Sequence, residues 1–290
     1  MSWRTVVISN SAKLDYQMGF LVVRGDSKSK IHLSEISTLI VESTAVSLTS
    51  YLLSELVKNK IKVVFCDEKR NPSSELLAYY GSHDTSAKIR KQIKWTDELK
   101  AGIWTEIVTE KIRNQERLLL SLEKPESQQL KEYINDLQYG DETNREGHAA
   151  KVYFGALFGR GFSRTEDSPV NAALNFGYTI VLSCFTRMIS ANGYMTQIGL
   201  FHDNMFNPFN LASDLMEPYR PLVDQMVFEM QPQRFETTEK HEMLRLLQSE
   251  ILIAGRKESF GNSVEIYVRS VFDAINDEDI SKIKFFQNEL

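Results

Sequence analysis

The hydrophobic pattern of the sequence changes once, near Leu76. Before it, short β-branched runs such as RTVVIS, GFLVV and KIHLSEISTLIVES are typical of strands. After it, long segments such as KIRKQIKWTDELKAGIWTEIVTEKIRNQERLLLSL repeat apolar residues at helical spacing. Because strands and helices need different apolar spacings, the change predicts an α+β fold. We expect a small β-rich N-terminal domain, residues 1–74, and a larger all-helical domain, residues 75–290.

One helix is expected among the strands of the first domain, and turn residues end the domain. LTSYLLSELVKNK has the spacing of a helix, and IKVVFCD that follows is typical of a buried strand. EKRNPSSE then carries the turn residues. In the second domain we expect helices throughout, apart from loops around residues 159–169, 199–209 and 255–261.

Composition excludes several classes of protein. Apolar residues make up 42% and charged residues 25%, the balance of a soluble globular protein. No apolar run approaches the ~18 residues of a membrane span, and the N-terminus lacks the pattern of a signal peptide, so we expect a cytoplasmic protein. Cys66 and Cys184 lie in apolar runs and predict buried, reduced thiols. A net charge of -5 means that nucleic-acid binding would need local basic patches.

The segment FNPFNLASDLMEPYRPLVD places Asp214 and Glu217 on one face of a predicted helix. Burying two carboxylates together is costly unless a cation offsets their charge. Pro218 removes the hydrogen bond to the carbonyl of Asp214, so we expect a bend there. Alternatively, both acids belong to a first helical turn, with Asn210 or Ser213 as its N-cap.

Two other segments carry candidate ligands. Glu146 precedes Gly147, and glycine costs a helix about 1 kcal/mol relative to alanine, which indicates a close approach to the backbone. The alternative is a capping box formed by Thr143 and Glu146. His202, in the loop GLFHDNMF, is either a ligand or a structural residue. Imidazole with carboxylates suits Mn²⁺, and Mg²⁺ in a mainly oxygen site, and such a cation would offset the two acids above.

Three blocks carry a resemblance to a known family. REGHAAKVYFGALFG, PVNAALNFGYTIVL and IGLFHDNMFNPFNLASDLMEPYRPLVD resemble signature blocks of the CRISPR-associated spacer-acquisition integrase and endonuclease. The whole chain is most similar to the short form of type II systems. The resemblance implies a divalent metal, Mg²⁺ or Mn²⁺, held by three catalytic ligands, Glu146, His202 and Glu217. It implies that Asp214 is a supporting or alternative ligand. It also implies that Asn171, Asn175 and Tyr178 line the site.

The resemblance also implies a reaction and partners. The 3′-hydroxyls of a prespacer DNA duplex would attack the phosphodiester at the ends of a CRISPR repeat next to its leader, inserting a spacer in antiviral defence. Water in place of the hydroxyl would make the site a nuclease. The implied assembly is a homodimer with a small ferredoxin-like CRISPR-associated partner, joined in type II systems by the effector nuclease and a ring-shaped accessory protein.

Basic residues beside the predicted site suggest where DNA binds. SAKIRKQIKW offers a basic face that ends in Trp95, and further arginines flank the site. The candidates are Lys88, Arg90, Lys91, Lys94, Arg160, Arg164 and Arg220. The alternative for each is a solvated helix face.

Other functions compete with the integrase. They are a general metal-dependent nuclease on branched or damaged DNA, a non-catalytic DNA-delivery scaffold and, least supported, a small-molecule metallohydrolase. The absence of further histidine ligands beside His202 argues against a zinc site.

Overall fold

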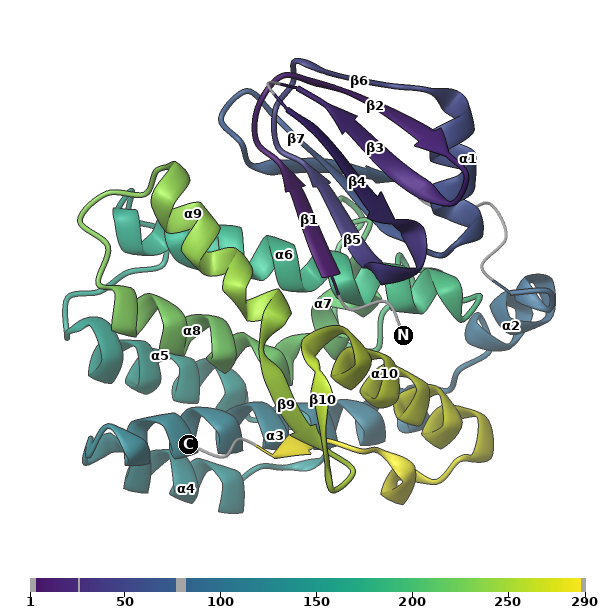
Figure 1. Cartoon of the computed structure of the whole chain (residues 1–290). Helices are drawn as coiled ribbons and strands as arrows, with labels where there is room; N and C mark the ends of the chain where they lie inside the picture. The colour runs from purple at the N-terminus through teal and green to yellow at the C-terminus, as the bar shows by residue number, and fades with distance from the viewer. Residues whose placement is uncertain (1–3, 26, 77–81, 288–290) are drawn as a thin grey trace. The chain divides into compact units, whose positions relative to one another are not determined.

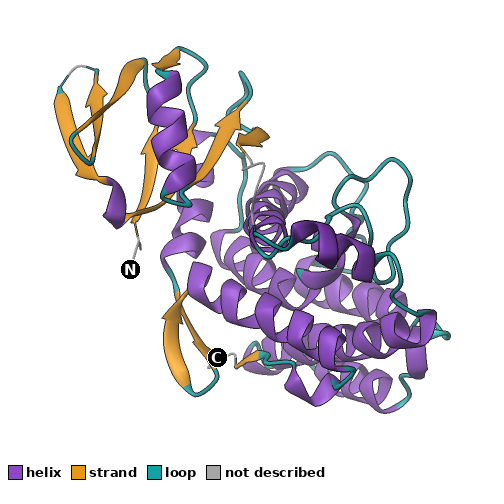
Figure 2. Cartoon of the chain, turned by 90° about the vertical axis from the view of Figure 1, so that its right-hand side faces the viewer, coloured by secondary structure: helices purple, strands orange, loops and turns teal. Residues whose placement is uncertain are grey.

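The chain divides into two compact units in a computed structural model that describes residues 4–25, 27–76 and 82–287 (Figure 1). The first unit comprises residues 1–79 with 247–249, and the second comprises residues 80–246 with 250–290. Strands gather in the first unit and helices in the second, which confirms the predicted α+β class (Figure 2). The domain boundary predicted between residues 74 and 75 stays a prediction.

Two four-stranded sheets and one helix build the first unit. In one sheet, of order β1-β5-β7-β8, the first three strands are parallel and β8 is antiparallel. The other has the order β4-β3-β2-β6, and only its β2–β6 pair is parallel. The elements are β1 (Arg4–Ile8), β2 (Ala12–Gln17), β3 (Phe20–Arg24), β4 (Lys28–His32), η1 (Leu33–Glu35), β5 (Ile36–Val41), β6 (Val46–Leu48), α1 (Ser50–Lys58), β7 (Lys62–Cys66) and β8 (Pro72–Leu76).

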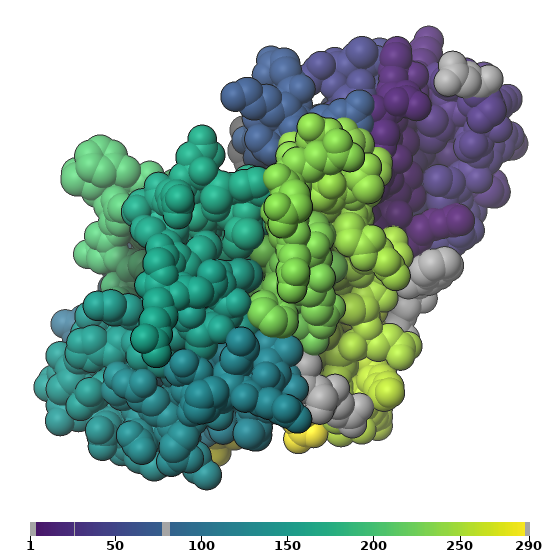
Figure 3. Space-filling view, turned by 90° about the vertical axis from the view of Figure 1, so that its left-hand side faces the viewer, coloured from purple at the N-terminus to yellow at the C-terminus, as the bar shows by residue number. Residues whose placement is uncertain are grey.

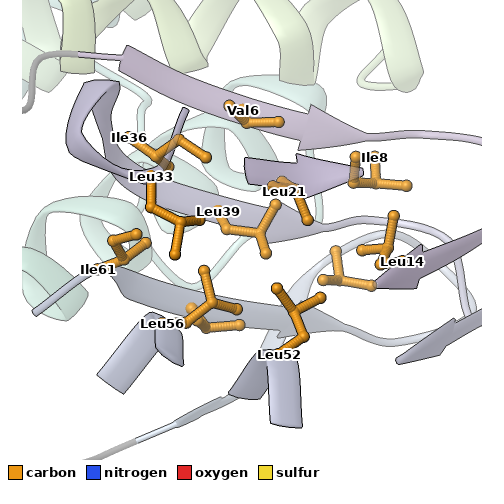
Figure 4. Close-up of a cluster of buried hydrophobic side chains, with 12 residues drawn as sticks. Val6, Ile8, Leu14, Leu21, Leu33, Ile36, Leu39, Leu52, Leu56 and Ile61 are labelled. Atoms are coloured by element: carbon orange, nitrogen blue, oxygen red, sulfur yellow. The ribbon is translucent and has the colours of Figure 1, made fainter. Parts of the chain in front are cut away.

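The core of this unit forms where apolar side chains of the strands meet those of α1 (Figure 4). Leu52 and Leu56 of α1 are fully buried, as is Leu39 of the central strand β5. The segment EKRNPSSE was predicted as a turn, which is wrong for its second half, because β8 begins at Pro72 and pairs with β7. Pro72 has no N–H to donate to a neighbouring strand, and it is tolerated because β8 is an edge strand of its sheet.

The second unit is built around two long helices, α3 and α6 (Figure 1). α3 packs against α4, α5, α7, η3, α8 and α10, and α6 packs against α7, α8, α9 and α10. The chain after residue 82 forms α2 (Thr85–Gln92), α3 (Asp97–Ser121), α4 (Glu126–Asn135), η2 (Tyr139–Asp141), α5 (Arg145–Phe158), α6 (Pro169–Ala191), α7 (Asn210–Leu215), η3 (Glu217–Tyr219), α8 (Arg220–Met230), α9 (Thr237–Leu244), η4 (Arg245–Gln248), β9 (Glu250–Ile253), β10 (Arg256–Ser259), α10 (Phe260–Asp277), η5 (Ile280–Lys282) and β11 (Phe286–Gln287).

The helix α6 is the apolar centre of this unit. It is long and apolar enough by composition to cross a bilayer, but 56% of that stretch is buried inside the protein. Its inward residues include Leu174, Val181, Phe185 and Ile189, which follow helical spacing. This burial makes α6 a core helix of the second unit.

The second unit is not all-helical, which corrects the prediction from the sequence. β9 and β10 form a hairpin to which β11 adds, where a loop was expected at residues 255–261 (Figure 2). Ala254 and Gly255 both have positive φ, 51° and 74°, as a tight two-residue hairpin turn needs. Strands of four residues are too short to show a clear alternation in sequence. The predicted loops around 159–169 and 199–209 are confirmed.

Cys66 and Cys184, both within the described part of the chain, form no disulfide. Cys184 is buried as predicted, whereas Cys66 is only half-buried.

Candidate functional site

Lys111 of α3 lies between two carboxylates that come from separate elements. Its ammonium contacts Oε1 of Glu146, in the first turn of α5, and Oε2 of Glu217, at the start of η3. The side chains of Lys111 and Glu217 are only 8% and 3% exposed, whereas that of Glu146 is 27% exposed. Glu146 and Glu217, both predicted as metal ligands, therefore meet at the buried ammonium of Lys111. The cluster is exposed to solvent on the side of Glu146.

A second basic residue holds Glu217. Nε of Arg220 lies 2.9 Å from its Oε1. Burial would raise the pKa of Glu217, but the charges of Arg220 and Lys111 outweigh burial and place the pKa below its ordinary value. Burial would likewise lower the pKa of Lys111, and the two glutamates raise it instead. The cluster is thus stable in its charged form.

Asp214 and Glu217 have different partners among the described residues, and the cation they were expected to share stays a prediction. Asp214 is fully buried, and its Oδ2 accepts hydrogen bonds from the backbone N–H groups of Leu200 (2.6 Å) and Phe201 (3.2 Å). Its Oδ1 accepts one from the N–H of His202 at 3.0 Å. The expected bend is confirmed, because α7 ends at Leu215 and η3 follows, and this break separates the surroundings of the two acids.

His202 is fixed by the same carboxylate. Its Nδ1 lies 2.6 Å from Oδ1 of Asp214, and this hydrogen bond raises the pKa of the imidazole above its ordinary value. The ring also meets Trp104 of α3 edge-on at 5.9 Å, and Trp104 stacks on Phe201 with ring centres 4.5 Å apart. Carboxylate–histidine pairs of this kind orient the imidazole so that Nε2 is left for a ligand.

The loop that carries His202 is shaped by Gly199 and Asn210. A Cβ at Gly199 would lie 2.3 Å from the carbonyl oxygen of His202 and 2.8 Å from Oδ2 of Asp214, so the close approach requires glycine. Nδ2 of Asn210 donates to the carbonyls of Gln197 and Asn204, each at 3.1 Å.

The alternative N-caps for α7 are wrong. Phe209 is its N-cap and makes no capping hydrogen bond, while Asn210 and Ser213 lie inside the helix. The loop before α7 projects from the surface (green lobe at the left of Figure 3), and the side chains of Met205 and Phe206 are 87% and 86% exposed there.

The start of α5 corrects the predicted capping box. Asn144, not Thr143, is the N-cap, and its Oδ1 accepts a hydrogen bond from the N–H of Gly147 at 3.2 Å. A Cβ at Gly147 would lie 2.7 Å from that Oδ1, which explains the glycine. Oδ2 of Asp141 accepts from the N–H of Glu146 at 3.1 Å, so two side chains set the first turn.

The three predicted site-lining residues lie on α6 in a network beside Arg220. Arg164 donates to Oδ1 of Asn171 and, at 2.7 Å, to Oδ1 of Asn175. The guanidinium carbons of Arg220 and Arg164 lie 4.7 Å and 5.4 Å from the ring centre of Tyr178.

The hydroxyl of Tyr178 leads to a second buried acid. It donates to Oδ1 of Asp224, and the hydroxyl of Tyr153 donates to Oδ2 at 3.0 Å. Burial raises the pKa of Asp224 to about 6 even though both hydrogen bonds oppose the shift. Nothing in the blocks quoted above singled out this acid, because its partners come from α5 and α6.

The predicted DNA-binding residues fall into two sets. Arg164 and Arg220 turn inward, as described above, and Lys88 pairs with Asp84 at 3.0 Å. The others are exposed and, among the described residues, pair with no carboxylate: Arg90, Lys91, Lys94 and Arg160. Gln92 anchors α2 to the loop after α6, donating to the carbonyls of residues 195 and 198 at 2.8 Å and 3.0 Å.

The residues fit a divalent metal in their chemistry but are not arranged around one. In the described part of the chain, no three His, Cys, Asp or Glu side chains are grouped closely enough to hold an ion. The two glutamates nevertheless converge on the ammonium of Lys111, and Oε2 of Glu217 receives no other hydrogen bond from the described residues. Carboxylates with one imidazole are a suitable donor set for Mn²⁺ or Mg²⁺.

Sequence reasoning missed Lys111 and Trp104. Lys111 is in register with Trp104, Ile107 and Leu118 at spacings of four and seven, along the buried face of α3. A lysine on an apolar stripe is a signal that could have been found, since such a charge needs partners when buried.

Comparison with known proteins places this chain in a family. The model of the family described as CRISPR associated protein Cas1 matches residues 5–251. The chain belongs to the Cas1 family. A curated relative from Neisseria meningitidis serogroup C (strain 8013), named CRISPR-associated endonuclease Cas1, is 31% identical over 291 residues, which are 98% of this chain and 96% of the relative.

Solved structures share the fold of the Cas1 family at lower identity. A casposase bound to an integration product has a TM-score of 0.75 and 16% identity over 96% of this chain and 91% of that one. A chain of a Cas6-RT-Cas1–Cas2 complex has a TM-score of 0.75 and 18% identity over 99% of this chain. This chain spans 36% of that longer one.

Proposed function

We propose that this chain is a DNA endonuclease and integrase of CRISPR adaptation. The observation that carries the proposal is the convergence of Glu146 and Glu217 on one buried cation, near an imidazole held by Asp214. Membership of the Cas1 family supports it, as do the relative named an endonuclease and the casposase bound to an integration product.

The proposed reaction is a transesterification of DNA. A 3′-hydroxyl of the prespacer attacks the phosphorus at the end of a CRISPR repeat, and a new P–O bond forms. The bond to the 3′-oxygen of the neighbouring nucleotide breaks, and that oxygen leaves with a proton as a new 3′-hydroxyl. Water in place of the attacking hydroxyl gives hydrolysis, and neither route needs a nucleophilic side chain.

The chain would hold a divalent metal, Mg²⁺ or Mn²⁺, through Glu146, Glu217 and Nε2 of His202. A bound cation would stabilise charge on the phosphate oxygens and lower the pKa of the attacking hydroxyl. Asp214 has both oxygens occupied, so its proposed role is to orient His202. Arg220 keeps Glu217 ionised, and the rings of Trp104 and Phe201 both contact the imidazole in T-shaped arrangements.

The exposed basic residues are proposed to bind the phosphates of prespacer and repeat DNA. Arg90, Lys91 and Lys94 lie at the anchored helix α2, and Arg160 follows α5. Binding through phosphates should weaken steeply as salt rises.

A homodimer with a small ferredoxin-like partner is the proposed assembly, supported by likeness to a chain of a complex that contains Cas2. The effector nuclease and ring-shaped accessory protein of type II systems are further proposed partners.

An integration assay tests this function. The purified chain is mixed with its small partner, a labelled prespacer duplex, a leader–repeat plasmid and Mn²⁺ or Mg²⁺. Wild type runs beside Glu146→Gln, His202→Ala and Glu217→Gln. Glu142→Gln, an exposed acid before the same helix α5, is the matched control. Circular dichroism and DNA binding show that each variant is folded.

The expected result is metal-dependent joining at the repeat ends that is lost in the three variants and kept in the control. Cutting that needs neither repeat nor partner would instead identify a general nuclease. DNA binding without cutting or joining would identify a delivery scaffold.

A further inference from the structure

Lys111 stands where the two proposed metal-ligating carboxylates converge. Its ammonium contacts Glu146 and Glu217 at once, and its side chain is 8% exposed. A buried lysine is stable only when paired, and each glutamate is held in place by the same pairing. In this structure, the ammonium therefore supplies the positive charge that offsets these two carboxylates.

A metal ion and this ammonium cannot both sit between the same oxygens. Mg²⁺ or Mn²⁺ on Glu146 and Glu217 would bind their oxygens directly and would repel a positive charge in contact with them. Metal binding on these two ligands therefore requires Lys111 to leave its contacts.

Lys111 is free to move in a way that Arg220 is not. Lysine is a compact charge on a flexible four-carbon stem, and the cluster opens to solvent beside Glu146. The guanidinium carbon of Arg220 lies 4.7 Å from the centre of the Tyr178 ring. Its Nε lies 2.9 Å from Oε1 of Glu217, which is the oxygen that Lys111 does not contact. Arg220 can therefore keep its place on Glu217 when Lys111 departs.

We propose that Lys111 is a positioning residue that holds Glu146 and Glu217 together without metal and is displaced from them when a divalent cation binds. The inference rests on the proposed function, because it takes these carboxylates as metal ligands. It adds a residue to the site, and it predicts that the metal competes with a group of the protein itself.

The first test measures Mn²⁺ binding to the full chain without DNA, by isothermal titration calorimetry. Lys111→Met removes the charge and keeps the length of the side chain. Lys100→Met is the matched control, since Lys100 lies on the same helix and pairs with the exposed Asp97. We expect Lys111→Met to bind Mn²⁺ at least tenfold more tightly than wild type, and to gain more thermal stability from Mn²⁺, while the control matches wild type.

A merely structural role for Lys111 gives the opposite result, because a disordered site binds metal less tightly. Equal or weaker Mn²⁺ affinity in Lys111→Met therefore overturns the proposal. Glu146→Gln and Glu217→Gln distinguish this failure from that of the proposed function. If both variants bind Mn²⁺ as tightly as wild type does, the carboxylates are not ligands and both proposals fail.

The second test uses the wild-type chain and does not depend on a folded variant. Lysine acetylation followed by mass spectrometry reports the exposure of each ammonium. We expect Lys111 to be protected without metal and to react severalfold faster at saturating Mn²⁺, with Lys100 unchanged. Protection of Lys111 that is the same with and without Mn²⁺ overturns the proposal.

Discussion

The carboxylate of Asp214 contacts the ring of His202 at 2.6 Å and also accepts hydrogen bonds from three consecutive backbone N–H groups, those of residues 200–202. One buried side chain thus fixes both the imidazole and the backbone that carries it. This relationship makes the loop and the proposed metal ligand a single structural unit.

Asp214→Asn should loosen this unit. The amide presents an NH₂ group to backbone donors that need an acceptor, so we expect the free energy of unfolding to fall by about 2–4 kcal/mol. Urea denaturation measures this change. Asp203→Asn, an exposed acid in the same loop, should change it by less than about 0.5 kcal/mol. Equal losses in the two variants would contradict the role of Asp214.

Gly199→Ala should destabilise the same loop by crowding the carboxylate of Asp214 and the backbone of His202. The added methyl meets the carbonyl of His202 at 2.3 Å and Oδ2 of Asp214 at 2.8 Å, so we expect a loss of about 1–3 kcal/mol. Gly155→Ala is the opposite case, because a Cβ added at Gly155 of α5 would meet no described atom within 4 Å outside its own helical backbone. Alanine there should stabilise the helix by about 0.5–1 kcal/mol. Thermal denaturation of both variants would expose the contrast, and an unchanged Gly199→Ala would refute it.

Asn144→Ala tests which residue caps α5. It removes the hydrogen bond to the N–H of Gly147 and leaves alanine at a φ of 52°, so we expect a loss of about 2 kcal/mol. Thr143→Val should be close to neutral, because Oγ1 of Thr143 is buried without a hydrogen-bond partner. Denaturation midpoints rank the two variants. The reverse ranking would restore Thr143 as the cap.

Asp224 should make stability depend on pH. Its pKa in the folded chain is about 6, above the ordinary 3.8, and the residue is 1% exposed. The stabilisation is fully present below about pH 4 and is lost as pH rises through about 6, a total near 3 kcal/mol. The sign follows because the unfolded chain loses this proton first.

Two variants test this dependence by urea unfolding between about pH 4 and about pH 7. Asp224→Asn should flatten the decline. Tyr153→Phe removes a hydrogen bond that favours the carboxylate, so it should raise the pKa further and extend the decline to higher pH. Identical pH profiles for wild type and Asp224→Asn would show that another group causes the dependence.

Local spacing was enough for much of the fold. The helical periodicity of residues 97–121 and the apolar run of β5 predict α3 and a buried strand, because each pattern repeats within one element. Short elements were missed for the same reason. β9 and β10 have four residues each, and the turn that joins them is decided by the positive φ of Ala254 and Gly255.

The candidate ligands could be named from three sequence blocks, but their partners could not. Spacing placed Asp214 and Glu217 on one helix face and suggested one shared cation. The break at Pro218 instead leaves Asp214 with loop backbone and His202, and Glu217 with Lys111 and Arg220. A change of direction over a few residues assigns two neighbouring acids to different surroundings.

The sequence by itself determined the α+β class, the long helices and the acids and histidine that could hold a metal, because these follow from residue type and short-range spacing. Only the tertiary structure decided what each of them meets. Lys111 and Glu146 are 35 residues apart in the chain and reach one another because α3 packs against α5 and η3. Contacts of that range depend on how helices pack, and no local pattern records them.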